Sequence, residues 1–341
     1  MVVIADAAVA ADAGLAADAA RRVATEALGR AVELDGPAEP LVGSHGRGAF
    51  TCRITGDRPH PWDRPLVVRI ADPAAVGRER AWHDLLAARG HPVPRALGST
   101  PAGDDDRAAL VLAQGPSFTL MEALGINPIA IPQLLRSMAE AHAALHRVAV
   151  DGAPGGAPGA APLAELDRAL ADPEMGDRFG AERAWLAGNA PSPGDPVICH
   201  GDLQPASMRL EGDDTSTAML VNWSHARVGD AEDDVALTLL MFWSAPYLAE
   251  GMGQRKMLKT VRDMITDGYR SAYEGADGSG PLDEGRLRYW GAVHALVMAV
   301  RLAEAERRGG PADAWDPVTL VHHAAPYRKD LGRRFARMTR G

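Results

Sequence analysis

Residues 197–207 read VICHGDLQPAS, residues 219–223 read MLVNW, and residues 229–236 read GDAEDDVA. An apolar run comes directly before His200-Gly201-Asp202, and a second one comes directly before Asn222-Trp223. Short apolar runs bounded by glycine and polar residues are typical of buried strands, and an acidic residue after glycine is a common helix start. The pattern therefore predicts a buried strand before His200 and a helix that begins near residue 233.

These three pieces resemble the catalytic segment of the aminoglycoside phosphotransferase and choline-kinase-like superfamily. That segment runs H-G-D-L-x-x-x-N, then apolar-D-W, then G-D-x-x-x-D-L-A at the opening of a helix. The match spans residues 199–236 in the same order and spacing, which is more specific than a single short motif. The resemblance implies an α+β, bilobal protein-kinase-like fold, with a small β-rich N-lobe and a larger α-helical C-lobe.

The resemblance also implies a role for each retained residue. Asp202 would orient the attacking hydroxyl, since phosphoryl transfer depends mainly on positioning and charge neutralisation. His200 would brace the loop through its ring nitrogens, so both residues are predicted catalytic-site residues. Asp234, at the start of a helix, would accept hydrogen bonds from amides of the loop.

The sequence departs from the family pattern at three positions. The family's loop Asn, a magnesium ligand, falls on Ser207, and its Asp before Trp, the second ligand, falls on Asn222. A hydroxyl oxygen can still bind a metal, but a neutral amide should bind magnesium more weakly than a carboxylate does. The strand lysine that contacts the nucleotide phosphates falls on Arg69, which keeps the charge but presents a wide planar fork. We therefore expect a weakened metal site at Ser207 and Asn222, and doubtful use of Mg.

Residues 41–48 (LVGSHGRG) lie between two predicted strands, where the family covers the nucleotide phosphates. Gly43, Gly46 and Gly48 would let backbone N–H groups approach phosphate, although the spacing is not G-x-G-x-x-G and a simple turn is the alternative. Glu79 is the expected partner of Arg69, with a solvated helix face as the alternative.

The adenine-binding hinge is expected at residues 112–114, with Leu112 and Gln114 as nucleotide contacts and residues 120–123 as a second possible register. His142 and His146 have the i,i+4 spacing of a zinc-binding helix. Ala143 stands where metalloproteases carry a Glu, so core packing is the expected role of both histidines.

The remaining pattern predicts strands first and helices afterwards, which is typical of an α+β protein. Predicted helices span residues 15–34, 73–90, 132–148, 163–171, 181–188, 233–246, 254–275, 284–306 and 328–339, and predicted strands span 40–42, 49–54, 65–70 and 108–113. The expected domains are an N-terminal arm and helix (1–36), a nucleotide-binding N-lobe (37–115) and a helical C-lobe (116–341).

Composition argues against a nucleic-acid-binding, disulfide-rich or membrane-spanning protein. A chain of 341 residues with 46% hydrophobic and 24% charged residues suits about two globular domains. A net charge of -9 argues against a nucleic-acid partner. Cys52 and Cys199 imply no disulfide framework, and no apolar run approaches the ~20 residues that span a bilayer. The acidic N-terminus lacks the basic residues of a signal peptide, so we expect a cytoplasmic protein without a membrane partner.

Three hypotheses follow. The first is an ATP- or GTP-dependent O-phosphotransferase acting on a hydroxyl of a small molecule or modified peptide, with Glu232 and Asp233 available to attract a cationic acceptor. The second is a pseudokinase that serves as a scaffold for a protein partner in a biosynthetic pathway. The third is a repurposed biosynthetic enzyme that uses the same cleft for different chemistry, since fold does not fix function.

Overall fold

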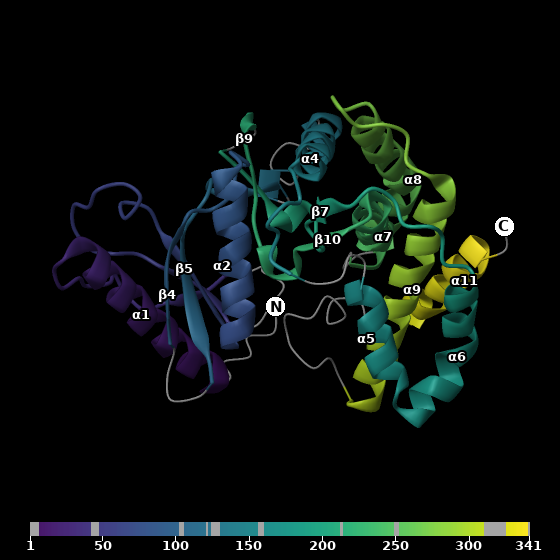
Figure 1. Ribbon diagram of the computed structural model, residues 1–341, viewed down its shortest axis with the longest axis horizontal. Coiled ribbons are helices and arrows are strands. Elements are labelled where there is room, and N and C mark those ends of the chain that lie inside the picture. The colour runs from purple at the N-terminus through teal and green to yellow at the C-terminus, as the bar shows by residue number, and fades with distance from the viewer. Residues whose placement is uncertain are drawn as a thin grey trace. The chain divides into compact units, whose positions relative to one another are not determined.

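The computed structural model describes residues 7–41, 48–101, 106–120, 122–123, 130–155, 160–211, 214–248, 252–309 and 325–339. The chain divides into two compact units, whose elements Figure 1 labels. Unit 1 contains Met1–Thr119 and Arg209–Ser224, and unit 2 contains Leu120–Met208 and His225–Gly341. Among the described helices, none combines the length and the apolar character that a bilayer span requires.

Unit 1 is built on a five-stranded antiparallel sheet. Its strands are, in spatial order, β1 (Glu39–Pro40), β2 (Ala49–Cys52), β3 (Leu66–Ala71), β5 (Ala108–Ala113) and β4 (Ala96–Pro101). The predicted strands at 49–54, 65–70 and 108–113 are confirmed within a few residues. β4 was not predicted, because ALGSTP contains glycine and proline and lacks the alternation that marks a strand.

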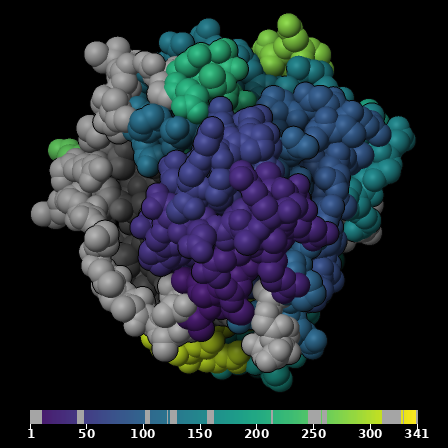
Figure 2. Space-filling model, turned by 90° about the vertical axis from the view of Figure 1, so that its left-hand side faces the viewer, coloured from purple at the N-terminus to yellow at the C-terminus, as the bar shows by residue number. Residues whose placement is uncertain are grey.

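Alternate residues of the central strands serve two different cores. Leu66 and Val68 of β3 belong to the core under α1 (Ala7–Leu28), whereas Leu110 and Leu112 of β5 pack with Val76 of α2 (Pro73–Ala88). Successive side chains of a strand point to opposite faces, so a sheet covered on both faces needs apolar residues throughout. Figure 1 shows α1 and α2 on the two faces, and Figure 2 views unit 1 from the side of α1, drawn in purple.

The ends of these helices follow from local chemistry. α2 starts after Asp72, whose carboxylate accepts a hydrogen bond from the Ala75 backbone N–H at 2.8 Å, and it has Pro73 in its first turn. α1 ends at Leu28 because Gly29 adopts a positive φ of 65°, so the predicted extension to residue 34 is wrong.

A second, three-stranded sheet is formed by β6 (Phe118–Thr119), β8 (Met208–Glu211) and β9 (Asp214–Leu220). β8 and β9 belong to the hairpin between the loop of Asp202 and Asn222. The hairpin therefore joins Asn222 to the sheet-bearing unit, although Asn222 lies 20 residues after Asp202 in a segment that the sequence assigns to the helical lobe.

Unit 2 is helical, with a small ladder that carries the loop of Asp202. β7 (Val197–Cys199) pairs antiparallel with β10 (Arg227–Gly229), and Cys199 lies opposite Arg227. The helices are α4 (Ile131–His146), α5 (Ala160–Leu170), α6 (Pro173–Gly188), α7 (Ala231–Leu248), α8 (Met252–Glu274), α9 (Glu284–Arg307) and α11 (Ala325–Thr339).

The core of unit 2 is organised around α9, which is buried along most of its length and packs against α5, α6, α7 and α11. Leu240 and Trp243 of α7, Leu302 of α9 and Tyr327 of α11 form one buried cluster. The predicted α+β class is confirmed, with an antiparallel sheet in the N-terminal part and helices in the C-terminal part.

Candidate active site

The loop that carries Asp202 leaves β7 through a sharp turn at Gly201. Gly201 has φ 78°, and a Cβ atom built there would lie 2.2 Å from the His225 backbone oxygen and 2.4 Å from Nη1 of Arg227. A side chain is excluded both by the left-handed backbone conformation and by this contact. The turn therefore requires glycine between His200 and Asp202.

Asp202 itself is nearly buried and held by its neighbours. Its carboxylate accepts a hydrogen bond from Nε2 of Gln204 at 3.1 Å, and its backbone N–H donates to Nδ1 of His200 at 3.3 Å. The Ser207 hydroxyl donates to the Asp202 backbone oxygen at 2.9 Å. His200 is fully buried, and its Nδ1 contact with the Asp202 backbone N–H stabilises the loop from inside.

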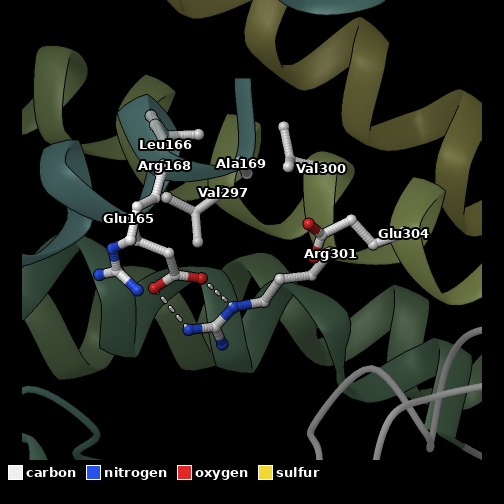
Figure 3. Close-up of a pocket in the computed structure, with 8 residues that line it drawn as sticks. All are labelled: Glu165, Leu166, Arg168, Ala169, Val297, Val300, Arg301 and Glu304. Atoms are coloured by element: carbon white, nitrogen blue, oxygen red, sulfur yellow. Dashed lines mark hydrogen bonds and ion pairs between the residues drawn. The ribbon is translucent and has the colours of Figure 1, made fainter. Parts of the chain in front are cut away.

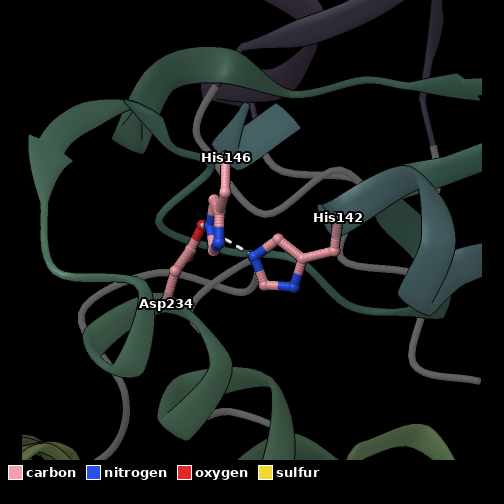
Figure 4. Close-up of side chains that lie close together, drawn as sticks. All are labelled: His142, His146 and Asp234. Atoms are coloured by element: carbon pink, nitrogen blue, oxygen red, sulfur yellow. Dashed lines mark hydrogen bonds and ion pairs between the residues drawn. The ribbon is translucent and has the colours of Figure 1, made fainter. Parts of the chain in front are cut away.

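Asp234, at the start of α7, connects this loop to the helical core. One carboxylate oxygen accepts from the Gly201 backbone N–H at 2.8 Å, and the other accepts from the His200 backbone N–H at 2.5 Å. The second oxygen also accepts from Nε2 of His142 at 2.9 Å and lies 3.3 Å from Nε2 of His146, as Figure 4 shows. Both carboxylate oxygens are thus surrounded by hydrogen-bond donors, and two of these donors are backbone N–H groups of the Asp202 loop.

The two histidines are held in turn by tyrosines of α8. Nδ1 of His142 lies 2.7 Å from the Tyr269 hydroxyl, and Nδ1 of His146 lies 2.6 Å from the Tyr273 hydroxyl. Burial raises the pKa of both tyrosines, so their hydroxyls keep the proton. Burial, with a smaller contribution from the neighbouring His142, lowers the pKa of His146 to about 4, so His146 is neutral at pH 7.

This network explains the charge state of Asp234. Burial alone would raise its pKa, but hydrogen bonds from His142 and His146 hold the pKa well below its usual range. His142, His146 and Asp234 also have three potential ligand atoms within 4.8 Å of one another. Each of these atoms already has a hydrogen-bond partner, so the cluster is satisfied without a metal and braces the loop. The core role predicted for both histidines is therefore combined with a polar contact that the sequence did not indicate.

The acidic residues before Asp234 also have internal partners. Asp233 is fully buried, and its carboxylate lies 2.6 Å from Nη2 of Arg227 and 2.7 Å from Nε2 of His294. Glu232 lies 3.2 Å from Nε of Arg286. These carboxylates neutralise cations of unit 2 itself, and this leaves the expectation that they attract a cationic acceptor without support.

In unit 1, the side chain of Arg69 points to the α2 face of the sheet. Nε of Arg69 lies 3.5 Å from Oε2 of Glu79, and Nη1 donates to Oδ1 of Asn222 at 3.1 Å. Arg69 and Glu79 are 7% and 4% exposed, so this is a buried pair rather than a solvated helix face. The structure brings together these three predicted site residues, of which Asn222 lies 153 residues from Arg69 in sequence.

The other predicted nucleotide residues are placed as follows. Gly48 has φ 71°, and its backbone oxygen accepts from the Ile70 N–H at 2.7 Å, while Gly43 and Gly46 lie outside the described residues. Leu112 is buried in β5, and the Gln114 backbone N–H donates to the Pro65 oxygen at 2.9 Å.

Two of the pockets that open on the described part of unit 2 are lined by no predicted site residue. One, of about 420 Å³, lies between α5 and α9, where Arg301 forms a two-pronged ion pair with Glu165 (Figure 3). The other, of about 560 Å³, lies between α4 and α8 and includes Met264, which is 63% exposed.

The buried acidic loop, the strand arginine paired with a helix glutamate and the order of the elements define a kinase-like phosphotransferase fold. The chain belongs to the phosphotransferase enzyme family known as APH, whose family match covers residues 50–282. The predicted family resemblance and kinase-like fold are therefore confirmed.

Individual relatives agree with this assignment. The chain is 28% identical to an aminoglycoside 3'-phosphotransferase of Streptomyces fradiae over 231 residues, which are 61% of this chain and 84% of that protein. The solved structure of an aminoglycoside-3'-phosphotransferase of type VIII superposes with a TM-score of 0.55 at 22% identity, covering 80% of this chain and 97% of that one. A thermostable mutant of APH(4)-Ia, solved with ADP and hygromycin B, gives 0.56 at 14% identity and covers 94% and 97%.

Proposed function

We propose that this protein is an ATP- or GTP-dependent O-phosphotransferase that acts on a hydroxyl of a small molecule or modified peptide. The observation that carries the proposal is the position of Asp202, on a glycine turn whose backbone amides are held by the buried Asp234 carboxylate. Catalysis of phosphoryl transfer depends on such a fixed carboxylate beside the acceptor hydroxyl. The relatives named aminoglycoside phosphotransferases, one of them solved with ADP, support a nucleotide donor and a polar small-molecule acceptor.

In this mechanism the acceptor oxygen attacks the γ-phosphorus of the nucleotide. The new bond joins the acceptor oxygen to phosphorus, and the bond from phosphorus to the β,γ-bridging oxygen breaks. The electron pair of that bond leaves with the nucleoside diphosphate, while the hydroxyl proton passes to the carboxylate of Asp202. Arg69 and the backbone of residues 43–48 would hold the phosphates, and residues 112–114 would hold the base.

The residues at the family's metal positions fit a divalent cation poorly. The Ser207 hydroxyl donates to the Asp202 backbone oxygen and offers only neutral lone pairs, and Oδ1 of Asn222 accepts from Arg69 at 3.1 Å and from the Ser224 hydroxyl at 3.2 Å. Magnesium prefers carboxylate and phosphate oxygens, and neither residue brings a negative charge. We therefore propose a weakened metal site and derive no step through a metal.

The test is formation of ADP from ATP, or GDP from GTP, together with the phosphorylated acceptor, for a panel of hydroxyl-bearing acceptors with wild type and Asp202→Asn. The variant keeps the shape of the side chain and removes its charge, so we expect unchanged folding and a ~10²–10⁴-fold loss of rate. Asp267→Asn is the matched control, because Asp267 is an exposed carboxylate on α8. Full activity of Asp202→Asn would refute the role of Asp202, and no turnover by wild type under any condition would favour the scaffold alternative.

A further inference from the structure

The guanidinium of Arg69 joins two side chains that come from distant parts of unit 1. Its Nε faces the Glu79 carboxylate at 3.5 Å, and its Nη1 donates to Oδ1 of Asn222 at 3.1 Å. The contact with Glu79 is shielded from water, since the side chains of Arg69 and Glu79 are 9% and 5% exposed, whereas the contact with Asn222 is only partly buried. A lysine ammonium is a compact point charge, whereas the arginine fork presents five N–H donors in a plane. The fork can therefore contact Glu79 and Asn222 together and still direct further donors elsewhere.

Asn222 is fixed so that its oxygen, and not its amino group, meets the guanidinium. Its backbone has φ 71°, a left-handed conformation that asparagine tolerates better than most residues. Oδ1 accepts from the Ser224 hydroxyl at 3.2 Å as well as from Arg69. Arginine can only donate hydrogen bonds, so the atom that faces Nη1 has to be the oxygen. The one side-chain atom of Asn222 that could bind a metal is thus engaged by a cation.

The formal charges of the group support the same conclusion. Those of Arg69 and Glu79 cancel, and Asn222 adds none, so the group is neutral by itself. A carboxylate at position 222 would make it negative, and a negative group beside nucleotide phosphates needs an added cation. The amide removes that need. Arginine at position 69 and asparagine at position 222 are therefore complementary in both charge and geometry.

We propose that the guanidinium of Arg69 occupies the Asn222 oxygen in place of a divalent cation, so that this protein binds nucleotide phosphates without a metal. The proposal rests on the proposed use of a nucleotide, and it specifies which side chain contacts the nucleotide phosphates. Arg69 would contact the phosphates through the guanidinium N–H groups that Glu79 and Asn222 leave over, while Asn222 and Glu79 set the plane of the fork. Bidentate N–H donation to phosphate oxygens is a binding mode for which arginine is well suited.

Calorimetric titration with ATP and GTP, in EDTA and in Mg²⁺, tests this directly. For wild type we expect dissociation constants that agree within about threefold between the two conditions. Arg69→Lys should weaken binding in EDTA by about tenfold or more, because the ammonium cannot contact both side chains. The exposed Arg53→Lys, which has the same chemical change on unit 1, should bind as wild type does.

Restoring a carboxylate provides the reverse test. Asn222→Asp should bind nucleotide poorly in EDTA, and Arg69→Lys combined with Asn222→Asp should gain a dependence on Mg²⁺ of about tenfold or more. Binding of Mn²⁺ in the presence of nucleotide, followed by its electron paramagnetic resonance signal, should be seen in the double variant and not in wild type. Circular dichroism checks that each variant is folded. If Arg69→Lys does not fold, the test is made with Asn222→Asp, which preserves the shape of the side chain.

The outcomes separate this inference from the proposed function. Nucleotide binding by wild type that requires Mg²⁺ would overturn the inference and leave the phosphotransferase proposal standing. Absence of binding in both conditions would refute the use of a nucleotide, and the inference with it. A double variant that binds nucleotide as strongly in EDTA as in Mg²⁺ would show that Asn222 does not occupy a metal-ligand position, which also overturns the inference.

Discussion

Replacing Asp234 by Asn removes one negative charge and converts one acceptor oxygen into an amino group. In the native protein the two carboxylate oxygens receive the backbone N–H groups of His200 and Gly201 and the Nε2 atoms of His142 and His146. The single oxygen of asparagine can accept the hydrogen bonds made to only one of the two carboxylate oxygens. On the other side an NH₂ group would face donors, and the side chain is fully buried, so water cannot replace the missing acceptor.

The cost can be estimated from these contacts. The histidines can partly adapt by exchanging tautomers, but the His200 backbone N–H cannot, and a buried donor without a partner costs ~1–3 kcal/mol. Losing the charge-assisted bonds adds to this, and breaking a buried charged group's contacts typically costs ~3–5 kcal/mol in all. For a domain of roughly 150–250 residues each kcal/mol lowers the melting temperature by about 2–4 °C, so we expect a decrease of about 6–20 °C.

Calorimetric melting of wild type and Asp234→Asn at pH 7 measures this effect, with Asp267→Asn as the exposed control. Because the folded-state pKa of Asp234 lies well below its usual range, its contribution is present above the unfolded pKa of ~3.9 and is lost as the pH falls through the folded value. The difference between the proteins should therefore be constant between about pH 5 and pH 8.

Amide hydrogen exchange locates the effect. Exchange at residues 200 and 201 should accelerate far more than exchange in the sheet of unit 1, since only the former amides donate to Asp234. If Asp234→Asn melts within 2 °C of wild type and leaves the protection of these two amides unchanged, the carboxylate is not the anchor of the catalytic loop.

Two further perturbations test neighbouring parts of the network. Gly201→Ala should destabilise the protein by more than about 3 kcal/mol or abolish turnover, because its Cβ would lie 2.2 Å from a backbone oxygen. The control is Gly180→Ala, in α6 with open space around it, which should be neutral or stabilising by ~0.5–1 kcal/mol. Equal urea midpoints for the two variants would contradict this account. The pKa of His146 is lowered to about 4, so the native state gains stability from a neutral ring above the unfolded pKa of ~6.5 and loses it as the pH falls from ~6.5 to ~4. This contribution amounts to about 3 kcal/mol, and His146→Gln should flatten the corresponding slope in urea unfolding between those values; parallel slopes would exclude His146 as its source.

Much of the fold follows from local patterns. The apolar runs at 65–70 and 108–113 predict strands, and the structure shows why these runs are apolar throughout, since both faces of the sheet are covered. The helical periods of the C-terminal half predict helices that the structure confirms. Their ends were less predictable. α6 begins at Pro173, capped by Asp172, eight residues before the predicted start at 181, because capping and packing extend a helix through residues of weak periodicity.

The sequence alone determined the class of the protein, because residues 199–236 keep their order and spacing whatever surrounds them. The residues that require glycine at position 201, His225 and Arg227, belong to the same segment. The partners of these residues were decided by tertiary structure. Asn222 meets Arg69 across a sequence separation of 153 residues, and His142 meets Asp234 across 92. Such contacts depend on how helices and strands pack, to within an ångström, and no local period encodes that distance. In the sequence, the neutral amide at position 222 is recognised only as the loss of a carboxylate metal ligand. The folded chain shows that the guanidinium of Arg69 contacts the oxygen of this amide.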